Sequence, residues 1–434
     1  MRLLKKNKIG FILTPGFRAA DVVGLYPILG GAIRNKVFLV AEKETCILGR
    51  SNFQVCADTN FENCPKLDVL VVGESLDSSY DNSKLTDFVK RKAREAKYVI
   101  GISNGVTLLA KAGLLKGKRA TSDRSNLEKM REFGAIPVNE NKPVVDGKFY
   151  TSGPSTGAIE SAFKVFSEIS GEKIARLWEL TQEYNPHKRF SSVPYSKEIV
   201  EKLVEKKKSL KIAVLSPPHM FVPDAMGAVD VLGSIPGAEV HYVWKKKGKA
   251  NGLLSPSIYS DTAFEECPQM DIIIVGAVQP GVSADEETIR FLKKQEKNAT
   301  AILGICAGVF VIGGAGLLKG KNAASNFHMT NLVSCVGATP SRKEVEIDGK
   351  IFTAGPIIGS YEAALIVVSN IYGKEVAAWI ENEILEYSPN PVFGVGSPEL
   401  AGKMLVALSK LFIIPGNPIY RRAAKSGYKK SQKM

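Results

Sequence analysis

Short apolar runs alternate with segments of helical periodicity along the first half of the chain. The runs are rich in Val, Ile and Leu and predict buried strands, whereas apolar residues at every third or fourth position predict helices. The predicted strands are residues 8–13, 36–40, 67–72 and 98–102, and the predicted helices are residues 21–33, 84–95, 105–112 and 157–170. This alternation predicts an α/β fold with a parallel sheet covered by helices on both faces.

The second half of the chain repeats the first. Gly-Ile-Ser-Asn-Gly-Val at 101–106 returns as Gly-Ile-Cys-Ala-Gly-Val at 304–309, and Ala-Gly-Leu-Leu-Lys-Gly-Lys at 112–118 returns at 315–321, both displaced by 203 residues. A repeat of this length predicts two homologous domains. The predicted division is a first domain at 1–187, a polar linker at 188–210, a second domain at 211–410 and a basic C-terminal tail at 411–434.

Cys306 and Ser103 each follow a predicted strand directly. Ligands of such sheets bind beyond the carboxyl ends of the strands, so these positions are the first candidates for chemistry. Gly-Ile-Cys-Ala-Gly has the layout of a nucleophile elbow, and a helix N-terminus would lower the pKa of the thiol from its usual value of about 8.5. The N–H groups of Ala307 and of Gly276 or Ala277 would form an oxyanion hole. The alternative is that Cys306 is a buried packing residue.

The chain resembles the DJ-one/ThiJ/PfpI family of the class I glutamine amidotransferase-like superfamily, once in each repeat. The resemblance rests on the elbow, on the Ala-Gly-Leu-Leu motif after it, on the acidic segment 224–232 and on the closing segment 387–399. It is most similar to the isonitrile hydratase-like branch. The resemblance implies two tandem flavodoxin-like (Rossmann-type) three-layer domains with parallel sheets. Because members of the family form homodimers, the two repeats would pair like such a dimer fused into one chain.

The resemblance also implies roles for two residues of the second repeat. Cys306 would be the nucleophile, and Asp224 would move protons as an acid/base beside it. The implied substrate is a small electrophile, either a 2-oxoaldehyde or an isonitrile that is hydrated, and neither reaction needs a cofactor or a metal. Asp224 also precedes a helical pattern, so an N-cap role is a further interpretation of this residue.

Two positions depart from the family's pattern. Isonitrile hydratases carry Thr after the nucleophile, where this chain has Ala307. Many members place a His on the strand after the elbow helix, where this chain has Asn326. Asn326 itself, His328, two residues further on, and His219, in a loop before Asp224, are the candidates for contact with a substrate.

The first repeat predicts a degenerate site. It has Ser103 in place of the cysteine, with Asp21 opposite, and its single histidine lies at position 187, directly before the predicted linker. A serine nucleophile needs a positioned base, so we expect this site to be catalytically silent. The competing hypothesis for the whole protein is a binding, scaffold or redox-sensing role.

Composition narrows the setting. The chain has 58 Lys and Arg against 44 Asp and Glu, and six of the excess positive charges lie in residues 411–434, which predicts at most an anionic partner for this tail. Six cysteines without metal-ligand spacing predict free thiols in a reducing cytoplasm. No apolar run reaches the roughly 20 residues that span a membrane. The remaining expected partners are a small-molecule substrate and further copies of the chain.

Overall fold

Each repeat folds into a seven-stranded sheet, and nearly all neighbouring strands are parallel. The first sheet has the order β10 (Val144–Asp146), β11 (Phe149–Ser152), β7 (Tyr98–Ile102), β6 (Val69–Val72), β1 (Lys8–Ile12), β2 (Lys36–Ala41) and β5 (Thr59–Asn60). The second has the order β16 (Thr262–Ala263), β13 (Glu239–Trp244), β12 (Lys211–Leu215), β17 (Ile272–Val275), β18 (Ala301–Ile305), β22 (Ile351–Ala354) and β21 (Val345–Asp348). Only β10 and β21 pair antiparallel within these described sheets. The predicted α/β fold with two parallel sheets is confirmed.

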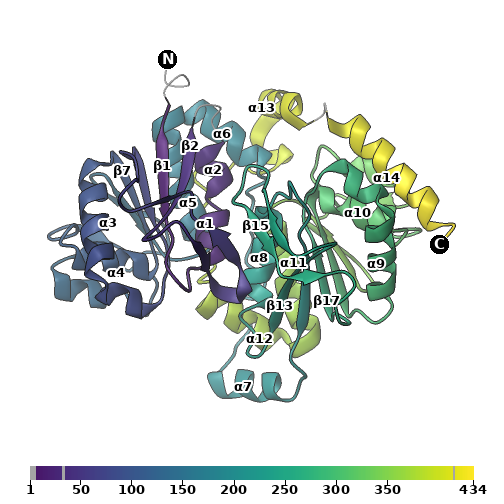
Figure 1. Ribbon diagram of the computed structural model, residues 1–434, viewed down its shortest axis with the longest axis horizontal. Helices are drawn as coiled ribbons and strands as arrows, with labels where there is room; N and C mark the ends of the chain where they lie inside the picture. Colours follow the sequence, from purple (N-terminus) through teal and green to yellow (C-terminus); the bar gives the residue numbers. More distant parts are fainter. Residues whose placement is uncertain (1–5, 32–34, 414–415) are drawn as a thin grey trace. The chain divides into compact units, whose positions relative to one another are not determined.

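Helices cover both faces of each sheet (Figure 1). In the first repeat they are α1 (Ala19–Val23), α2 (Tyr26–Gly30), α3 (Ser83–Glu95), α4 (Asn104–Lys111), α5 (Thr156–Ser170) and α6 (Glu172–Thr181). In the second they are α7 (Lys197–Glu205), α8 (Pro223–Leu232), α9 (Glu286–Glu296), α10 (Val309–Gly314), α11 (Ile358–Tyr372), α12 (Lys374–Trp379), α13 (Pro398–Ile413) and α14 (Asn417–Ser431). No helix in the described part of the chain combines the length and apolar character needed to cross a membrane.

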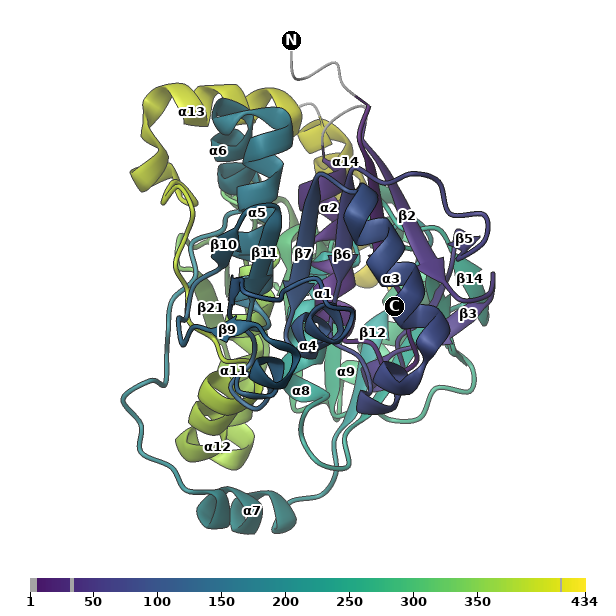
Figure 2. The same ribbon diagram turned by 90° about the vertical axis from the view of Figure 1, so that its left-hand side faces the viewer.

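Shorter elements connect these layers. Small two-stranded pairs are β3 (Cys46–Leu48) with β4 (Gln54–Cys56), β8 (Arg119–Ala120) with β9 (Ile136–Pro137), β14 (Gly248–Ala250) with β15 (Ile258–Ser260), and β19 (Asn322–Ala323) with β20 (Thr339–Pro340). Single helical turns are η2 (Arg50–Asn52), η3 (Asp77–Asp81), η4 (Lys129–Phe133), η5 (Pro280–Ala284), η6 (Cys306–Gly308), η7 (Thr330–Val336) and η8 (Ile380–Ile384). Figure 2 shows β10, β11, β7 and β6 side by side.

The computed structural model describes residues 6–31, 35–413 and 416–434. The helix predicted at 21–33 is two short helices, α1 and α2, and positions 32 and 33 of that prediction lie outside the described residues. The break falls between Val23 and Tyr26, where Pro27 is the second residue of α2. Proline lacks the N–H that a continuous helix needs, so a new helix begins there.

The chain divides into two units whose boundaries differ from the predicted ones. One unit contains Met1–Trp178 with Leu385–Phe393, and the other contains Glu179–Ile384 with Gly394–Met434. The end of the first repeat therefore belongs to the second unit, and the short segment Leu385–Phe393 of the second repeat belongs to the first unit. The predicted linker 188–210 belongs to the second unit, because the Glu381 carboxylate accepts hydrogen bonds from the N–H groups of Arg189 and Phe190 at 2.7 and 2.9 Å.

The basic C-terminal segment is not a free tail. Helix α13 runs across the predicted boundary at 410, residues 414 and 415 lie outside the described part, and α14 packs against η5, α10 and η7 of the second unit. Lys430 forms an ion pair with Glu286 at 3.2 Å, and the Tyr420 ring lies 6.0 Å from that of Phe310. The small buried residues Ala424 and Gly427, the Tyr420 ring and the Lys430 ion pair hold this segment, and its positive charge alone did not indicate this packing.

Replacing Gly427 of α14 by alanine is expected to lower the melting temperature. A Cβ at this position would lie 1.8 Å from the Ser283 carbonyl oxygen, so α14 would have to move away from η5. Overpacking of this kind costs about 1–3 kcal/mol. Thermal unfolding of Gly427→Ala measures the change, and Gly281→Ala is the matched control because a Cβ there meets no atom within 4 Å. Equal melting of the two variants would contradict this docking.

Two cysteines are not free thiols. Cys46 and Cys56 lie opposite each other on β3 and β4 and form a disulfide. The prediction that all six cysteines are free is wrong for this pair, because the hairpin brings together two residues that are ten positions apart in the sequence. Cys64, Cys267, Cys306 and Cys335 are free.

Candidate active site

Cys306 occupies the tight turn between β18 and η6 in the second unit. Its φ of 54° is the strained backbone that a nucleophile elbow requires. A Cβ on Gly308 would lie 2.0 Å from the carbonyl oxygen of Val275, and one on Gly304 would lie 2.7 Å from the Ile312 side chain. Glycine is therefore needed at position 308, where the contact is with backbone, whereas a Cβ at position 304 would require the Ile312 side chain to move. The thiol is left partly exposed at the carboxyl end of the sheet.

Asp224 lies in the first turn of α8 and is fully buried. Its two carboxylate oxygens accept hydrogen bonds from the N–H groups of Ala277 at 3.2 Å and Ile357 at 3.1 Å. The Cys306 thiol is a third hydrogen-bond partner. Val222 is the N-cap of α8, so the N-cap interpretation of Asp224 is wrong. Burial raises the pKa of Asp224 to about 7, although its backbone partners and the thiol act in the opposite direction.

One predicted donor of the oxyanion hole is already occupied. Because the Ala277 N–H donates to Asp224, it is directed away from an oxyanion, and this part of the prediction is wrong. The Ala307 N–H hydrogen-bonds with the sulfur of Cys306, and Gly276 packs against the Cβ of Asp224. The participation of Ala307 and Gly276 in an oxyanion hole stays a prediction.

The electrostatic surroundings of Cys306 oppose ionisation of the thiol. Burial is the largest cause that raises its pKa, followed by the charges of Asp224 and Glu183. The Ala307 N–H lowers the pKa, but this contribution is smaller. The sequence pattern predicted a lowered pKa from the helix N-terminus, and this is wrong because burial of the thiol, together with the charges of Asp224 and Glu183, outweighs the N–H group at the start of η6.

Glu183 is a site residue that the sequence analysis missed. Its Oε1 accepts a hydrogen bond from the Phe327 N–H at 3.0 Å, and a Cβ on Gly355 would lie 2.8 Å from its Oε2. Burial raises the pKa of Glu183 to about 8. A signal was present in the repeat: Glu183-Tyr-Asn-Pro matches Glu386-Tyr-Ser-Pro at the common displacement of 203.

A cavity of about 230 Å³ opens beside Glu183. Its lining is mostly polar and includes Glu183, Ser325, Phe327, Ser341, Arg342 and Gly355. Ser325 also donates a hydrogen bond to the carbonyl oxygen of Cys306 at 2.7 Å, so the same wall supports the elbow and borders the cavity. The volume suits a small polar molecule rather than a large cofactor.

The structure does not bring the two candidate histidines to the thiol. His219 is exposed and its backbone N–H donates to the Asn251 carbonyl. His328 lies in a turn rather than on a strand, and its Nε2 is 2.9 Å from the Ser409 hydroxyl of α13. The Asn326 amide oxygen accepts the N–H of His328 at 3.0 Å. The contacts of His219, Asn326 and His328 therefore connect neighbouring loops and α13. Burial lowers the pKa of His328 to about 4.

One group of side chains has the composition of a metal site. Ligand atoms of His187, Glu344 and Glu362 lie within 4.8 Å of one another. The Arg189 guanidinium, however, donates to Glu362 through Nε at 2.9 Å and lies 3.1 Å from Glu344. The Arg189 side chain therefore already neutralises the carboxylates of Glu344 and Glu362, and ion pairs explain why these side chains lie together.

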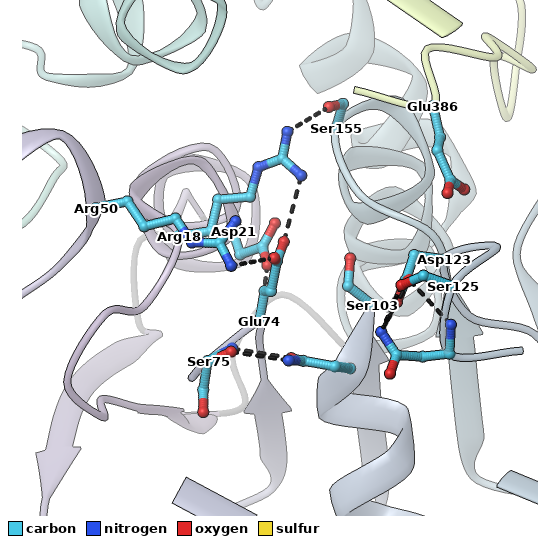
Figure 3. A network of polar contacts seen from close by, with 12 residues as sticks. Arg18, Asp21, Arg50, Glu74, Ser75, Ser103, Asp123, Ser125, Ser155 and Glu386 are labelled. Carbon is cyan, nitrogen blue, oxygen red and sulfur yellow. Dashed lines mark hydrogen bonds and ion pairs between the residues drawn. The ribbon is translucent and has the colours of Figure 1, made fainter. Parts of the chain in front are cut away.

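The corresponding site of the first unit carries a different polar network (Figure 3). Ser103 has a φ of 49°, and the Asp21 carboxylate accepts the N–H of Glu74 at 2.9 Å, as Asp224 does from Ala277. Arg18, which is buried, forms an ion pair with Glu74 at 3.3 Å and donates to Ser155 at 3.4 Å.

These polar residues replace apolar ones of the second repeat. Arg18, Glu74 and Ser155 align with Phe221, Ala277 and Ile357. The Ser103 hydroxyl is buried and has no hydrogen-bond partner within the described part of the chain. No base contacts this hydroxyl among the described residues, and the catalytic silence of this site stays a prediction.

Known proteins resemble this chain over one or both repeats. An isonitrile hydratase of Pseudomonas putida is 34% identical over 200 residues, which is 46% of this chain and 87% of that protein. Protein DJ-1 homolog A of Arabidopsis thaliana is 25% identical over 313 residues, 68% of this chain and 75% of the relative. A deglycase of Thermococcus kodakarensis is 27% identical over 117 residues, 26% of this chain and 70% of the relative.

A solved structure of a ThiJ/PfpI family protein from Pseudomonas syringae covers 56% of this chain and 99% of its own, with a TM-score of 0.48 and 23% identity. The model of the DJ-1/PfpI family matches residues 7–168 and 210–369, one match in each repeat. The chain therefore belongs to the DJ-1/PfpI family.

Proposed function

We propose that the second unit is a cysteine-dependent enzyme that adds water to a small electrophile, with Cys306 as nucleophile and Asp224 as acid/base. The observation that carries the proposal is the hydrogen-bonded pair of thiol and buried carboxyl, whose pKa of about 7 lets it take and return a proton at neutral pH. The relatives named isonitrile hydratase and deglycase support an enzyme of this general type.

For an isonitrile, the Cys306 sulfur bonds to the terminal carbon while the thiol proton passes to Asp224. Asp224 then returns the proton to that carbon, which gives a thioimidate. Water adds to the same carbon, and expulsion of the thiol leaves an N-substituted formamide. One water is consumed, and both residues return to their starting protonation.

For a 2-oxoaldehyde, the sulfur bonds to the aldehyde carbon and the thiol proton passes to the aldehyde oxygen, which gives a hemithioacetal. Asp224 takes the proton from that carbon and delivers it to the neighbouring carbon, while the hydroxyl proton of the hemithioacetal passes to the former ketone oxygen, so that a thioester results. Water hydrolyses the thioester to a 2-hydroxy acid and releases the thiol. The deglycase relative favours this second candidate.

The test is product formation by the full chain with cyclohexyl isonitrile and with phenylglyoxal, followed by NMR as the formamide and as mandelate. We expect at least one product above the protein-free rate. If neither forms, while Cys306 still reacts with iodoacetamide, the protein is a binding, scaffold or redox-sensing member of its family.

Turnover is expected to rise with pH up to neutrality. Asp224 accepts the thiol proton only as a carboxylate, so this form is present above its pKa of about 7 and is lost below it. The pH dependence of kcat/KM reports this group in the free enzyme, and we expect a loss of about tenfold per pH unit on the acid side. A flat profile between about pH 5.5 and about pH 7.5 would contradict the role of Asp224 as base.

A further inference from the structure

The end of the first repeat is built into the second unit. Residues 179–187 belong to this unit, although the sequence repeat assigns them to the first domain. The N–H of His187 donates to Glu362 at 2.8 Å, and the N–H of Val395 donates to Glu179 at 2.9 Å. A Cβ on Gly396 would lie 1.9 Å from the Tyr184 carbonyl oxygen, so the segment is closely packed.

This packing fixes the direction of one side chain. The φ of Glu183 is 49° and that of its counterpart Glu386 is 44°, a backbone conformation that few residues with side chains adopt. The Phe327 N–H binds Oε1 of Glu183, while Gly355 leaves room for Oε2. Glu183 lines the cavity, and its charge reaches Cys306. A strained backbone conformation that the surrounding packing holds in place, beside a cavity and a nucleophile, indicates a functional role.

We propose that Glu183 is a catalytic member of the Cys306 site that donates a hydrogen bond from Oε2 to the bound substrate. The second unit's site then contains an acid from the first repeat. The inference rests on the proposed function and narrows its substrates to those that present a hydrogen-bond acceptor beside the attacked carbon. The 2-oxoaldehyde oxygen and the nitrogen of the thioimidate both meet this condition.

The protonation of Glu183 suits a donor. Burial raises its pKa to about 8, so the protonated form is present at neutral pH and is lost above that value. Because Oε1 already accepts the Phe327 N–H, the proton is placed on Oε2. The proton stays on Glu183 throughout, so the hydrogen bond changes no step of the proposed reaction.

Other titratable groups face this centre. Asp224 and Cys306 interact with Glu183 through their charges. Burial raises the pKa of Tyr420 of α14, and the charges of Cys306 and Asp224 raise it further. The Tyr420 hydroxyl donates to the Val278 carbonyl at 2.8 Å. With Asp224 ionised above about pH 7 and Glu183 protonated below about pH 8, turnover is expected to fall again on the alkaline side.

Two substitutions in the full chain test the inference. Glu183→Gln keeps an oxygen for the Phe327 N–H and an amide that donates at every pH. We expect it to keep neutral turnover within about tenfold and to remove the alkaline decline. Glu183→Leu removes the donor and is expected to lower turnover by about 100-fold. Glu386→Gln and Glu386→Leu, at the matched position of the first unit, are the controls and are expected to change neither quantity.

Alkylation of Cys306 by iodoacetamide gives a readout without substrate. Removing the carboxylate in Glu183→Gln is expected to shift the alkylation midpoint to lower pH, because a neighbouring negative charge raises the pKa of a thiol. An unchanged midpoint together with an unchanged alkaline arm would overturn the inference. If the wild-type protein converts neither substrate, the proposed function fails. In that case the alkylation midpoint alone tests Glu183, and an unchanged midpoint in Glu183→Gln overturns its place in the site.

Discussion

Cys306→Ala is expected to reduce turnover of the isonitrile or 2-oxoaldehyde by about a thousandfold or more. The sulfur forms the covalent bond in both proposed reactions, and alanine offers no atom that can replace it. The measurement is kcat/KM for the substrate class that the wild-type protein converts. The elbow should fold normally, because a Cβ is already present at this position and its φ of 54° is tolerated.

The matched control for Cys306→Ala is Ser103→Ala in the first unit. Ser103 occupies the same turn with a φ of 49°, but its hydroxyl has no hydrogen-bond partner among the described residues. We expect this variant to keep wild-type turnover. Turnover that falls in Ser103→Ala and survives in Cys306→Ala would reverse the assignment of the active and the silent repeat.

Asp224→Asn is expected to have two opposite effects. Turnover should fall by about a hundred- to ten-thousandfold, because an amide cannot accept the thiol proton. The Cys306 thiol should at the same time ionise at lower pH, since the Asp224 charge is one of the causes that raise its pKa. Turnover and the pH dependence of iodoacetamide labelling, with Cys64 and Cys267 as internal references, measure the two effects.

Asp21→Asn is the control for this variant. Asn in place of Asp224 turns an NH₂ group toward one of two backbone N–H groups, so a folding defect must be distinguished from a catalytic one. Asp21 accepts the N–H of Glu74 in the same way, so its variant carries a similar cost but should leave turnover unchanged. If Asp224→Asn labels like wild type at every pH, the thiol and the carboxyl do not form a functional pair.

The two units show how one fold is kept while its site changes. Both keep the strained elbow and the aspartate that binds the backbone of the neighbouring loop. Around the serine, Arg18 and Glu74 form a buried ion pair where the second unit has the apolar side chains of Phe221 and Ala277. In the second unit, burial raises the pKa of Asp224 to about 7.

The sheets were predictable because their strands are continuous apolar runs that helices must cover. The predicted strand at 98–102 coincides with β7, and the helix predicted at 84–95 differs from α3 by one residue. The helix predicted at 21–33 was wrong because periodicity is insensitive to a proline near a helix start. The packing of α14 was missed because net charge indicates solvation and says little about one apolar face.

The sequence by itself determined the doubled α/β fold and the elbow at Cys306, because these features depend on local sterics and on the order of strands, which short motifs record. The pairing of Cys306 with Asp224 was implied by the resemblance to the family. The tertiary structure alone decided that Glu183 joins this site, that Ala277 binds Asp224, that His328 turns to Ser409 and that the pKa of the thiol is raised. Burial and the packing of segments that are distant in the sequence produce these effects. A short sequence motif does not record which distant segments come into contact.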